Sequence, residues 1–416
     1  MDRRNRYNRD GDRRDKFKYE ENVDLELYKN SKEDEELIQD IESFEDLNLN
    51  ANLLRGIYSN GFEKPSIIQK KAIRPFMTGR DIIAQAQSGV GKTGTFCISI
   101  LNSIEPELKM TQAIILSPTM ELASQNDMVL RKLGLYMNLT YNISIKRVNI
   151  NENINSLKRN PHIVVGTPGR IYDMINRGAL KTDDIKYFIL DEADEMLSLG
   201  FVSQIKDIFM TLPKDVQVGL YSATMGKDFF EITRELMRNP INILVKTGQL
   251  TLEGIKQYKI NVERNDYKFE TLCDLYKILN INQTMIYCNS KRNVERLTQN
   301  LIDNSFTVSY IHGGMSSDER TSTMDDFKKG KTRILVSTDL LSRGIDVQQV
   351  SIVINYDIPS TVDKYLHRIG RCGRYGRKGV SVNFMTKYDE KRMEHIEQYY
   401  HTIIDDLPQD ISCLLE

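Results

Sequence analysis

The chain of 416 residues is 40% hydrophobic and 28% charged, a balance typical of soluble globular proteins and long enough for about two or three domains. Its apolar runs fall short of the roughly 20 residues that span a bilayer, which argues against an integral membrane protein. A net charge of −1 argues against indiscriminate coating of nucleic acid, so any nucleic-acid site is expected to be a local patch. Five scattered cysteines predict free thiols in a reducing, intracellular compartment, either cytoplasmic or nuclear.

The first 40 residues are polar and charged, with an Arg-rich opening followed by the acidic stretch SKEDEELIQD. This composition predicts a disordered tail over residues 1–40. We interpret the tail either as a solubilising leader or as a weak arm that binds RNA or a partner.

After this tail, short apolar runs rich in β-formers alternate with helical patterns, which predicts βαβ units with buried parallel strands. The runs in the first half are DIIAQA, AIILSP, HIVVGTP, YFILDEAD and VQVGLYSAT, and those in the second half are TMIYCN, VSYIHGG, TRILVSTD, SIVINYD and VSVNFMT. Polar residues and glycines interrupt the pattern between the two series. We therefore expect an α/β fold of two lobes, residues 41–243 and 255–416, joined by a linker over residues 244–254.

The segment DIIAQAQSGVGKTGTF predicts a strand, a glycine loop and the start of a helix. Its core, AQSGVGKT, is a phosphate-binding loop with alanine in place of the usual first glycine. Gly89 and Gly91 let backbone N–H groups wrap a phosphate, while Lys92 supplies charge and the Thr93 hydroxyl suits Mg²⁺. We expect ATP and Mg²⁺ as cofactors, with Ser88 of the same loop at the nucleotide.

The segment YFILDEADEM places two carboxylates at the end of an apolar strand. Buried carboxylates are costly unless they are paired or coordinate a metal. Asp191 is therefore predicted to hold Mg²⁺, and Glu192 to orient and deprotonate the attacking water. The alternative is an acidic helix N-terminus favoured by the helix dipole, which accounts well for Asp194 and Glu195.

The segment HRIGRCGRYGR carries arginines at a spacing of three. Arg371 and Arg374 are predicted to reach a γ-phosphate as arginine fingers, and a basic surface loop is the alternative. This motif lies in the second half of the chain and the phosphate loop in the first. An ATP molecule bound by both would therefore close the cleft between the lobes.

The ordered motifs GFEKPSIIQ, AQSGVGKT, SPTMELA, TPGR, DEAD, SAT, STDLLSRGID and HRIGRCGR resemble those of the DEAD-box RNA helicases over about residues 42–416. The resemblance is closest to the subgroup of initiation factor 4A and 4A-III. It implies two tandem RecA-like lobes, each a parallel sheet flanked by helices. It also implies an RNA-dependent ATPase that binds the RNA backbone and unwinds short duplexes locally through ATP-driven closure of the lobes.

The resemblance further implies roles for the residues that match its motifs. Phe44 and Gln69 would recognise adenine, by stacking and by hydrogen bonds. The second lobe would engage ATP through Gly344, Asp346, Arg371 and Arg374. The residues implied to couple the ATP and RNA sites are Asp194, Ser222, Thr224 and His367. Those implied to bind RNA are Pro118, Thr119, Thr167, Gly169, Arg170, Arg320 and Thr338.

Two departures from the family pattern concern the RNA grip. Met120 stands where the family has arginine, and Lys146 and Arg147 align approximately with its glycine pair. One interpretation is neutral drift, or an error of register, with Met120 filling apolar space. The other is a relocated positive charge, in which Lys146 and Arg147 bind RNA. Replacing both by alanine would then lower the salt slope of RNA binding, by roughly 0.7 for each phosphate contact on a single strand.

Three functions stay open on the sequence alone. The first is an RNA-dependent ATPase that remodels duplexes, the second is an ATP-gated RNA clamp whose hydrolysis is held back by partners, and the third is a DNA helicase or small-molecule kinase. The third does not account for Gln69 together with the DEAD, SAT and HRIGR motifs. Expected partners are single-stranded or short duplex RNA, and a regulator such as a helical scaffold of the initiation-factor or exon-junction type. We expect a monomer without membrane attachment.

Overall fold

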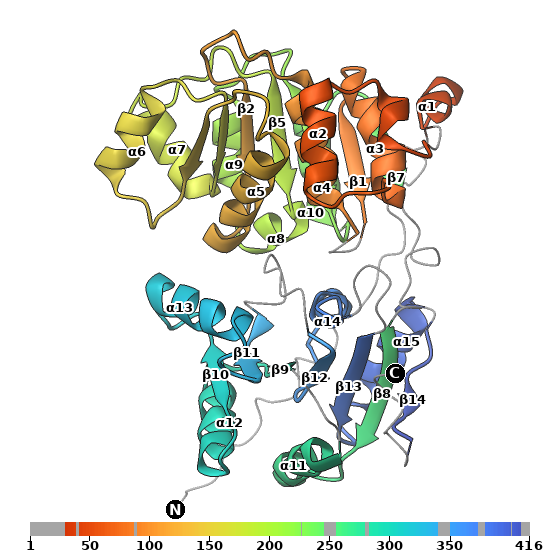
Figure 1. Ribbon diagram of the computed structural model, residues 1–416. Helices are drawn as coiled ribbons and strands as arrows, with labels where there is room; N and C mark the ends of the chain where they lie inside the picture. The colour runs from red at the N-terminus through yellow and green to blue at the C-terminus, as the bar shows by residue number, and fades with distance from the viewer. Residues whose placement is uncertain are drawn as a thin grey trace, which may run out of the picture.

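The computed structural model describes residues 30–38, 41–86, 90–225, 227–244, 255–278, 283–339, 350–372, 379–400 and 402–408. Over this part of the chain it has two α/β lobes, which lie one above the other in Figure 1. None of the described helices is both long and apolar enough to cross a membrane.

The first lobe is built on a seven-stranded sheet in the order β3-β4-β2-β5-β6-β1-β7, with all strands parallel. Its strands are β1 Ile82–Gln85, β2 Ala113–Leu116, β3 Tyr141–Ser144, β4 Ile163–Gly166, β5 Tyr187–Asp191, β6 Gln217–Ser222 and β7 Ile241–Leu244. The central strands β2, β4 and β6 are buried along their whole length, because helices cover both faces of the sheet.

Two hydrophobic clusters fill the two sides of this sheet. One is formed with α2 to α5 and the other with α7 to α10. The helices are α2 Ala51–Ser59, α3 Ile67–Met77, α4 Lys92–Ser103, α5 Met120–Leu133, α6 Ile150–Leu157, α7 Pro168–Asn176, α8 Ala193–Ser198, α9 Val202–Phe209 and α10 Lys227–Leu236, with a 3₁₀ turn at Phe44–Leu47.

Part of the predicted tail belongs to the first lobe, which corrects the boundary at residue 40. Helix α1 (Lys32–Leu37) begins at a Ser31 cap that accepts the Asp34 N–H. The Asp34 carboxylate is buried and accepts from Arg80 Nη1 at 2.7 Å. The Asn30 side chain bonds the backbone of Asn242 in β7. A cap and a specific ion pair therefore order a segment whose composition alone predicts disorder, whereas residues 1–29 lie outside the described part of the chain.

The second lobe repeats the architecture, with a seven-stranded parallel sheet in the order β10-β11-β9-β12-β13-β8-β14. Its strands are β8 Ile255–Asn261, β9 Thr284–Tyr287, β10 Val308–Ile311, β11 Ile334–Ser337, β12 Ile352–Asn355, β13 Gly379–Met385 and β14 Asp405–Asp406. Its helices are α11 Lys268–Ile278, α12 Lys291–Asp303, α13 Ser317–Lys328, α14 Val362–Ile369 and α15 Glu390–Tyr400. The prediction of two RecA-like lobes is confirmed.

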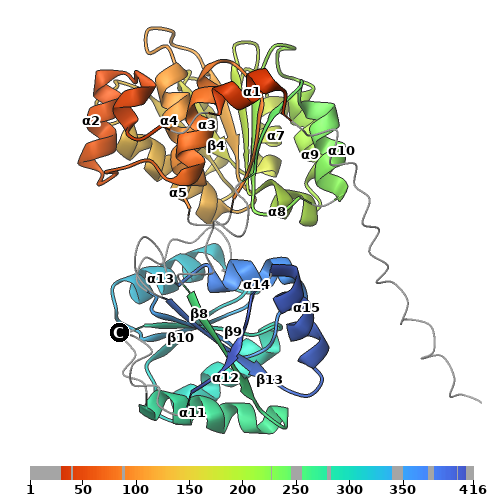
Figure 2. The same ribbon diagram turned by 90° about the vertical axis from the view of Figure 1, so that its right-hand side faces the viewer.

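The two lobes face each other through a small set of elements. Figures 1 and 2 both show α13 and α14 of the second lobe turned towards α5 and α8 of the first. Helix α5 follows β2, and α8 follows β5, so this side of the first lobe carries the carboxyl ends of its strands. In parallel α/β sheets that edge is where ligands bind.

Candidate active site between the two lobes

The phosphate loop ends at Gly91, which adopts a left-handed backbone (φ 104°) and caps the N-terminus of α4. A Cβ at this position would lie 2.6 Å from Ser66 Oγ, so the close approach requires glycine. Gln69 Nε2 donates to the Gly91 carbonyl at 3.3 Å, and Gln69 Oε1 accepts from the Ser66 N–H at 2.9 Å. The predicted adenine-recognition residue thus lies against the loop, while Ser88 and Gly89 lie outside the described residues.

The next residue, Lys92, forms a buried ion pair at the end of β5. Its Nζ lies 3.3 Å from Glu192 Oε2, and the two side chains are 4% and 7% exposed. Glu192 has a positive φ of 50°, a conformation that is uncommon for a residue other than glycine and carries a cost of about 1–3 kcal/mol. The strained turn directs the carboxylate towards the phosphate loop, where it pairs with Lys92.

Asp191 is the neighbouring acid, and it is almost fully buried. Asn126 Nδ2 donates to its Oδ2 at 2.8 Å and also donates to Ser117 Oγ at 3.0 Å, which fixes the carboxylate on β5. Burial, and then the nearby Glu192 charge, raises the pKa of Asp191 to about 7.

The oxygen ligands available here suit Mg²⁺. The described residues contain no cluster of three or more His, Cys, Asp or Glu that would hold a metal by themselves. Mg²⁺ is commonly held by one or two carboxylates together with substrate phosphates and water. A buried carboxylate on Asp191 and a partly exposed hydroxyl on Thr93, at the start of α4, match that requirement.

The two aromatic residues near the adenine side differ in exposure. Phe44 is fully buried and packs edge-on against Tyr58, with ring centroids 6.4 Å apart. Phe62 is partly exposed, and its Cε1 lies 3.2 Å from where a Cβ on Gly94 would stand at the first turn of α4. Adenine recognition by Phe44 stays a prediction, and Phe62 is an aromatic that sequence reasoning did not single out, although it lies in the motif GFEKPSIIQ.

The four residues predicted to couple the sites lie together. Thr224 Oγ1 donates to Asp194 Oδ2 at 2.8 Å, and Ser222 Oγ accepts the Asp194 N–H at 3.4 Å. His367 Nε2 of the second lobe lies 3.8 Å from Asp194 Oδ2, and both side chains are buried. This contact joins α14 to the first turn of α8 directly across the gap between the lobes.

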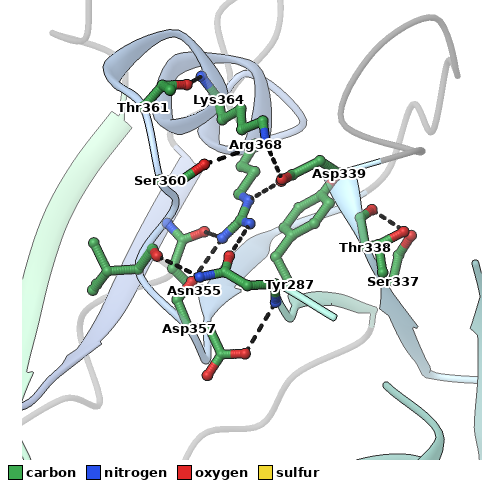
Figure 3. A network of polar contacts seen from close by, with 12 residues as sticks. Tyr287, Ser337, Thr338, Asp339, Asn355, Asp357, Ser360, Thr361, Lys364 and Arg368 are labelled. Carbon is green, nitrogen blue, oxygen red and sulfur yellow. Dashed lines mark hydrogen bonds and ion pairs between the residues drawn. The ribbon is translucent and has the colours of Figure 1, made fainter. Parts of the chain in front are cut away.

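Helix α14 is fixed by Arg368, a fully buried arginine that sequence reasoning passed over for its neighbours (Figure 3). Its guanidinium lies over the Tyr287 ring at 5.3 Å. It donates to Asp339 Oδ1 at 2.5 Å, to the Asp357 carbonyl at 2.7 Å, to Asn289 Oδ1 at 2.7 Å and to Asn355 Oδ1 at 3.3 Å. These partners follow or end β9, β11 and β12, so one side chain ties the helix to three strands.

Arg371 lies just past the C-terminus of α14, and its side chain is buried. Its N–H donates to the Arg368 carbonyl at 3.2 Å, so the position of the predicted arginine finger depends on the anchored helix. Gly344, Asp346 and Arg374 lie outside the described residues.

The predicted RNA residues of the first lobe lie at the start of α5 and around α7. Pro118 is buried, and Thr119 Oγ1 accepts the Leu122 N–H at 3.2 Å as the N-cap of α5. Met120 packs against the hydrophobic core, as the apolar interpretation of this departure requires. At α7, Thr167 is half-buried and Gly169 is exposed.

Arg170 has a local structural use. Its Nη1 donates to the Val148 carbonyl at 2.9 Å and its Nη2 to the Lys146 carbonyl at 3.2 Å. The guanidinium thereby holds both sides of Arg147 in the loop between β3 and α6. In the second lobe Thr338 is half-buried after β11.

Two arginines that were predicted to bind RNA lie between the lobes. Arg320 Nη2 on α13 is 3.6 Å from Glu121 Oε1 on α5. Arg147 Nε of the first lobe is 3.2 Å from Asp318 Oδ1, and its Nη1 donates to Thr321 Oγ1 at 3.0 Å. RNA binding by Lys146 and Arg147 stays a prediction. In this arrangement the Arg147 guanidinium contacts α13 of the second lobe.

Comparison with known proteins places these features in a family. Residues 66–232 match the DEAD/DEAH box helicase model, and residues 267–376 match the helicase conserved C-terminal domain. The chain is 54% identical over 374 residues to eukaryotic initiation factor 4A of Drosophila melanogaster, covering 90% of this chain and 93% of that protein.

Similar solved structures include those of Dbp5 of S. cerevisiae. S. cerevisiae Dbp5 bound to RNA and ADP BeF3 matches with a TM-score of 0.82 at 34% identity, over 89% of this chain and 96% of that one. A variant of Dbp5 bound to Nup159, Gle1, IP6 and ADP gives a TM-score of 0.65 at 33% identity, over 87% and 96%. The TM-score is thus higher against the RNA-bound complex than against this one.

Proposed function

Since this chain belongs to the DEAD-box family and is an ATP-dependent RNA helicase similar to eukaryotic initiation factor 4A, we propose that it closes its lobes on ATP, Mg²⁺ and RNA through the residues described above. The observation that carries this proposal is the line of contacts from the buried Lys92–Glu192 pair to Asp194 and His367. The Lys92–Glu192 pair lies at the predicted nucleotide site, and Asp194 contacts the second lobe. A nucleotide that binds at the first can therefore affect the position of the second lobe.

In the ATP site each residue has one task. When ATP binds, the Lys92 ammonium moves from the Glu192 carboxylate to the β/γ-phosphates. The Glu192 carboxylate then orients the attacking water and accepts its proton. Thr93 and Asp191 hold Mg²⁺, which supplies positive charge to the phosphoryl oxygens when it is bound. Burial makes Asp191 costly to ionise without a cation, which supports this assignment.

Adenine recognition falls to Gln69 and Phe62 in this proposal. The half-exposed Phe62 ring beside the first turn of α4 provides an apolar face for the base. Gln69 presents an amide that its bonds to Ser66 and Gly91 already orient.

RNA is gripped through its backbone. The hydroxyl and helix N-terminus at Thr119 suit a phosphate, and no base-specific contact is needed. Removal of the γ-phosphate releases Arg371, and the contact between His367 and Asp194 then separates as the lobes open.

A steady-state ATPase assay with and without single-stranded RNA tests the function. We expect RNA-stimulated phosphate release. Tight RNA binding with little turnover would favour the ATP-gated clamp, and stimulation by DNA or a metabolite in place of RNA would contradict an RNA helicase.

Glu192→Gln tests the assignment of roles within the site. Because the amide keeps the shape of the side chain but cannot accept the proton, kcat should fall about 10²- to 10⁴-fold. ATP-dependent RNA binding, measured by fluorescence anisotropy, should persist. Glu107→Gln at an exposed position of the same lobe is the control, and loss of RNA binding in Glu192→Gln would contradict the separation of roles.

We also propose that a protein partner regulates the cycle. The support is that solved structures of the similar protein Dbp5 include complexes with Gle1. A helical scaffold spanning both lobes would act by favouring or opposing closure.

A further inference from the structure

The loop between β3 and α6 carries an arginine that reaches the other lobe. Arg147 contacts Asp318 at 3.2 Å and Thr321 at 3.0 Å, two residues that lie one helical turn apart on α13. The loop itself is held from α7, because Arg170 bonds the carbonyls on either side of Arg147. The Arg147 side chain is therefore presented to α13 from an anchored backbone.

This contact lies beside a second ion pair, in which the second lobe supplies the arginine and the first lobe the acid. Arg320 on α13 approaches Glu121 on α5, so each lobe contributes one arginine and one acid. Asp318 and Arg320 both belong to the first turn of α13. The two ion pairs have opposite polarity, so each lobe presents one positive and one negative side chain to the other. A shift of α13 along its axis would bring like charges together, which makes these contacts specific for this arrangement of the lobes.

Arg147 lies at one of the two departures from the family pattern noted in the sequence. Its loop aligns approximately with a glycine pair in the family pattern, and glycine has no side chain with which to bridge the lobes. A bridge here shares α13 with Arg320, on the side of the gap where RNA is expected. In its absence, the Arg320–Glu121 pair is the ion pair that links the described residues of the two lobes on that side.

We propose that Arg147 is a positioning residue that holds the lobes closed through Asp318 and Thr321, so that nucleotide alone closes this chain in part without RNA. The inference rests on the proposed function, because it requires that closure assembles the ATP site. Its consequence is a higher RNA-independent ATPase rate and a smaller stimulation by RNA than the same chain shows without the bridge.

The size of the effect follows from the exposure of the pair. The Arg147 and Asp318 side chains are 49% and 82% exposed, so solvent screens their attraction. Exposed ion pairs change an equilibrium by at most about fivefold, and the added Thr321 bond places the expected effect at about two- to fivefold. Raising the salt concentration should reduce it further.

Single-molecule energy transfer between a dye on each lobe measures the closed-to-open ratio with ADP–BeF3 and no RNA. Arg147→Ala and Asp318→Ala should each lower this ratio about two- to fivefold and lower the RNA-free ATPase rate by a similar factor. Arg147→Asp should lower it at least as much, and the exchange Arg147→Asp with Asp318→Arg should restore it. That rescue separates a bridge from a general loss of structure.

Matched controls remove the same charges elsewhere. Arg159→Ala takes an exposed arginine from the first lobe, and Asp325→Ala takes an exposed acid from the same helix as Asp318. Both should leave the closed-to-open ratio unchanged. An unchanged ratio in Arg147→Ala, or an exchange variant that behaves like Arg147→Asp alone, would overturn the proposal.

RNA titrations distinguish the remaining outcomes. If Arg147→Ala lowers the salt slope of RNA binding by about 0.7 and leaves RNA-free closure unchanged, Arg147 is a phosphate ligand and the bridge is refuted. If the unmodified chain fails to close even with ADP–BeF3 and RNA together, the proposed function fails as well. If the unmodified chain closes with ADP–BeF3 and RNA but Arg147→Ala has no effect on closure, only the bridge proposal is refuted and the proposed function stands.

Discussion

Burial decides what a motif residue can do. Phe44 and Phe62 both belong to the segment before the phosphate loop, yet Phe44 is enclosed by the core and only Phe62 has a face open beside α4. Met120 shows the same at α5, since its partly buried side chain packs against the core, whereas Thr119 beside it is the predicted RNA residue. At this scale the structure separates side chains enclosed by the core from side chains that keep an open face.

Alanine substitutions at the two phenylalanines should therefore change different quantities, the stability for Phe44 and the KM for ATP for Phe62. Phe44→Ala should lower the free energy of unfolding by about 3–5 kcal/mol, because it leaves a cavity in the core. Phe62→Ala should leave stability nearly unchanged and raise the KM for ATP by about two- to tenfold, as expected for the loss of one stacking contact. Urea unfolding and ATPase kinetics measure the two quantities. A raised KM with unchanged stability in Phe44→Ala would reverse the assignment.

At the scale of elements, helix α14 connects the fold of the second lobe to its chemistry. Arg368 holds the helix on the ends of three strands from a fully buried position (Figure 3). His367, next to it, contacts Asp194 of the first lobe, and Arg371, the predicted arginine finger, lies just past the end of the helix. A single anchored helix thus positions two residues of the site at once.

Arg368→Lys should disrupt this element although it keeps the charge. A lysine cannot reproduce the planar fork that reaches several acceptors, so buried acceptors lose their donors. We expect the second lobe to lose about 3–5 kcal/mol of stability, as for other broken buried pairs, and kcat to fall with the displacement of Arg371. Hydrogen exchange in β9 and β12 measures the local effect. Lys364→Ala removes a half-exposed partner of Asp339 and a bond to Ser360, and it should cost less than about 1 kcal/mol.

At the scale of the whole molecule, the described contacts between the lobes are few and polar. They include the His367–Asp194 contact on the nucleotide side, and the two α13 ion pairs and the Arg147–Thr321 hydrogen bond on the predicted RNA side. Neither side has a large apolar interface among the described residues, so the lobes are free to separate when ligands leave. Closure is therefore set by the ligands that both lobes bind together with these few polar contacts.

His367→Ala should reduce the coupling between nucleotide and RNA without removing either site. The change in RNA affinity on adding ADP–BeF3 should equal the change in ADP–BeF3 affinity on adding RNA, because coupling is reciprocal. Coupling free energies are about 1–3 kcal/mol, or about 5- to 150-fold, and both ratios should fall towards one in the variant. Two binding titrations measure them. A variant in which one ratio falls and the other does not would show that the preparation is not at equilibrium.

The sheets and the ATP motifs are predictable because their signals are local. Continuous apolar runs indicate β2, β4 and β6, and a few adjacent residues define the phosphate loop and the two acids at the end of β5. The partner of Arg147 is 174 positions away at Thr321, and no spacing in the sequence indicates such a pair. The same applies to helix α1, where the long-range contact to Arg80 overcomes a composition typical of disorder.

Strand order has a consequence for how the chain reaches its fold. In the first lobe β1 lies between β6 and β7, and in the second lobe β8 lies between β13 and β14. The first strand of each lobe therefore finds its neighbours only when the last strands have been synthesised. Folding of each lobe must wait for such distant pairing, which is slow and leaves strand edges open to aggregation. During translation the first lobe should complete only after residues 241–244 have emerged from the ribosome, and the α13 ion pairs should form last.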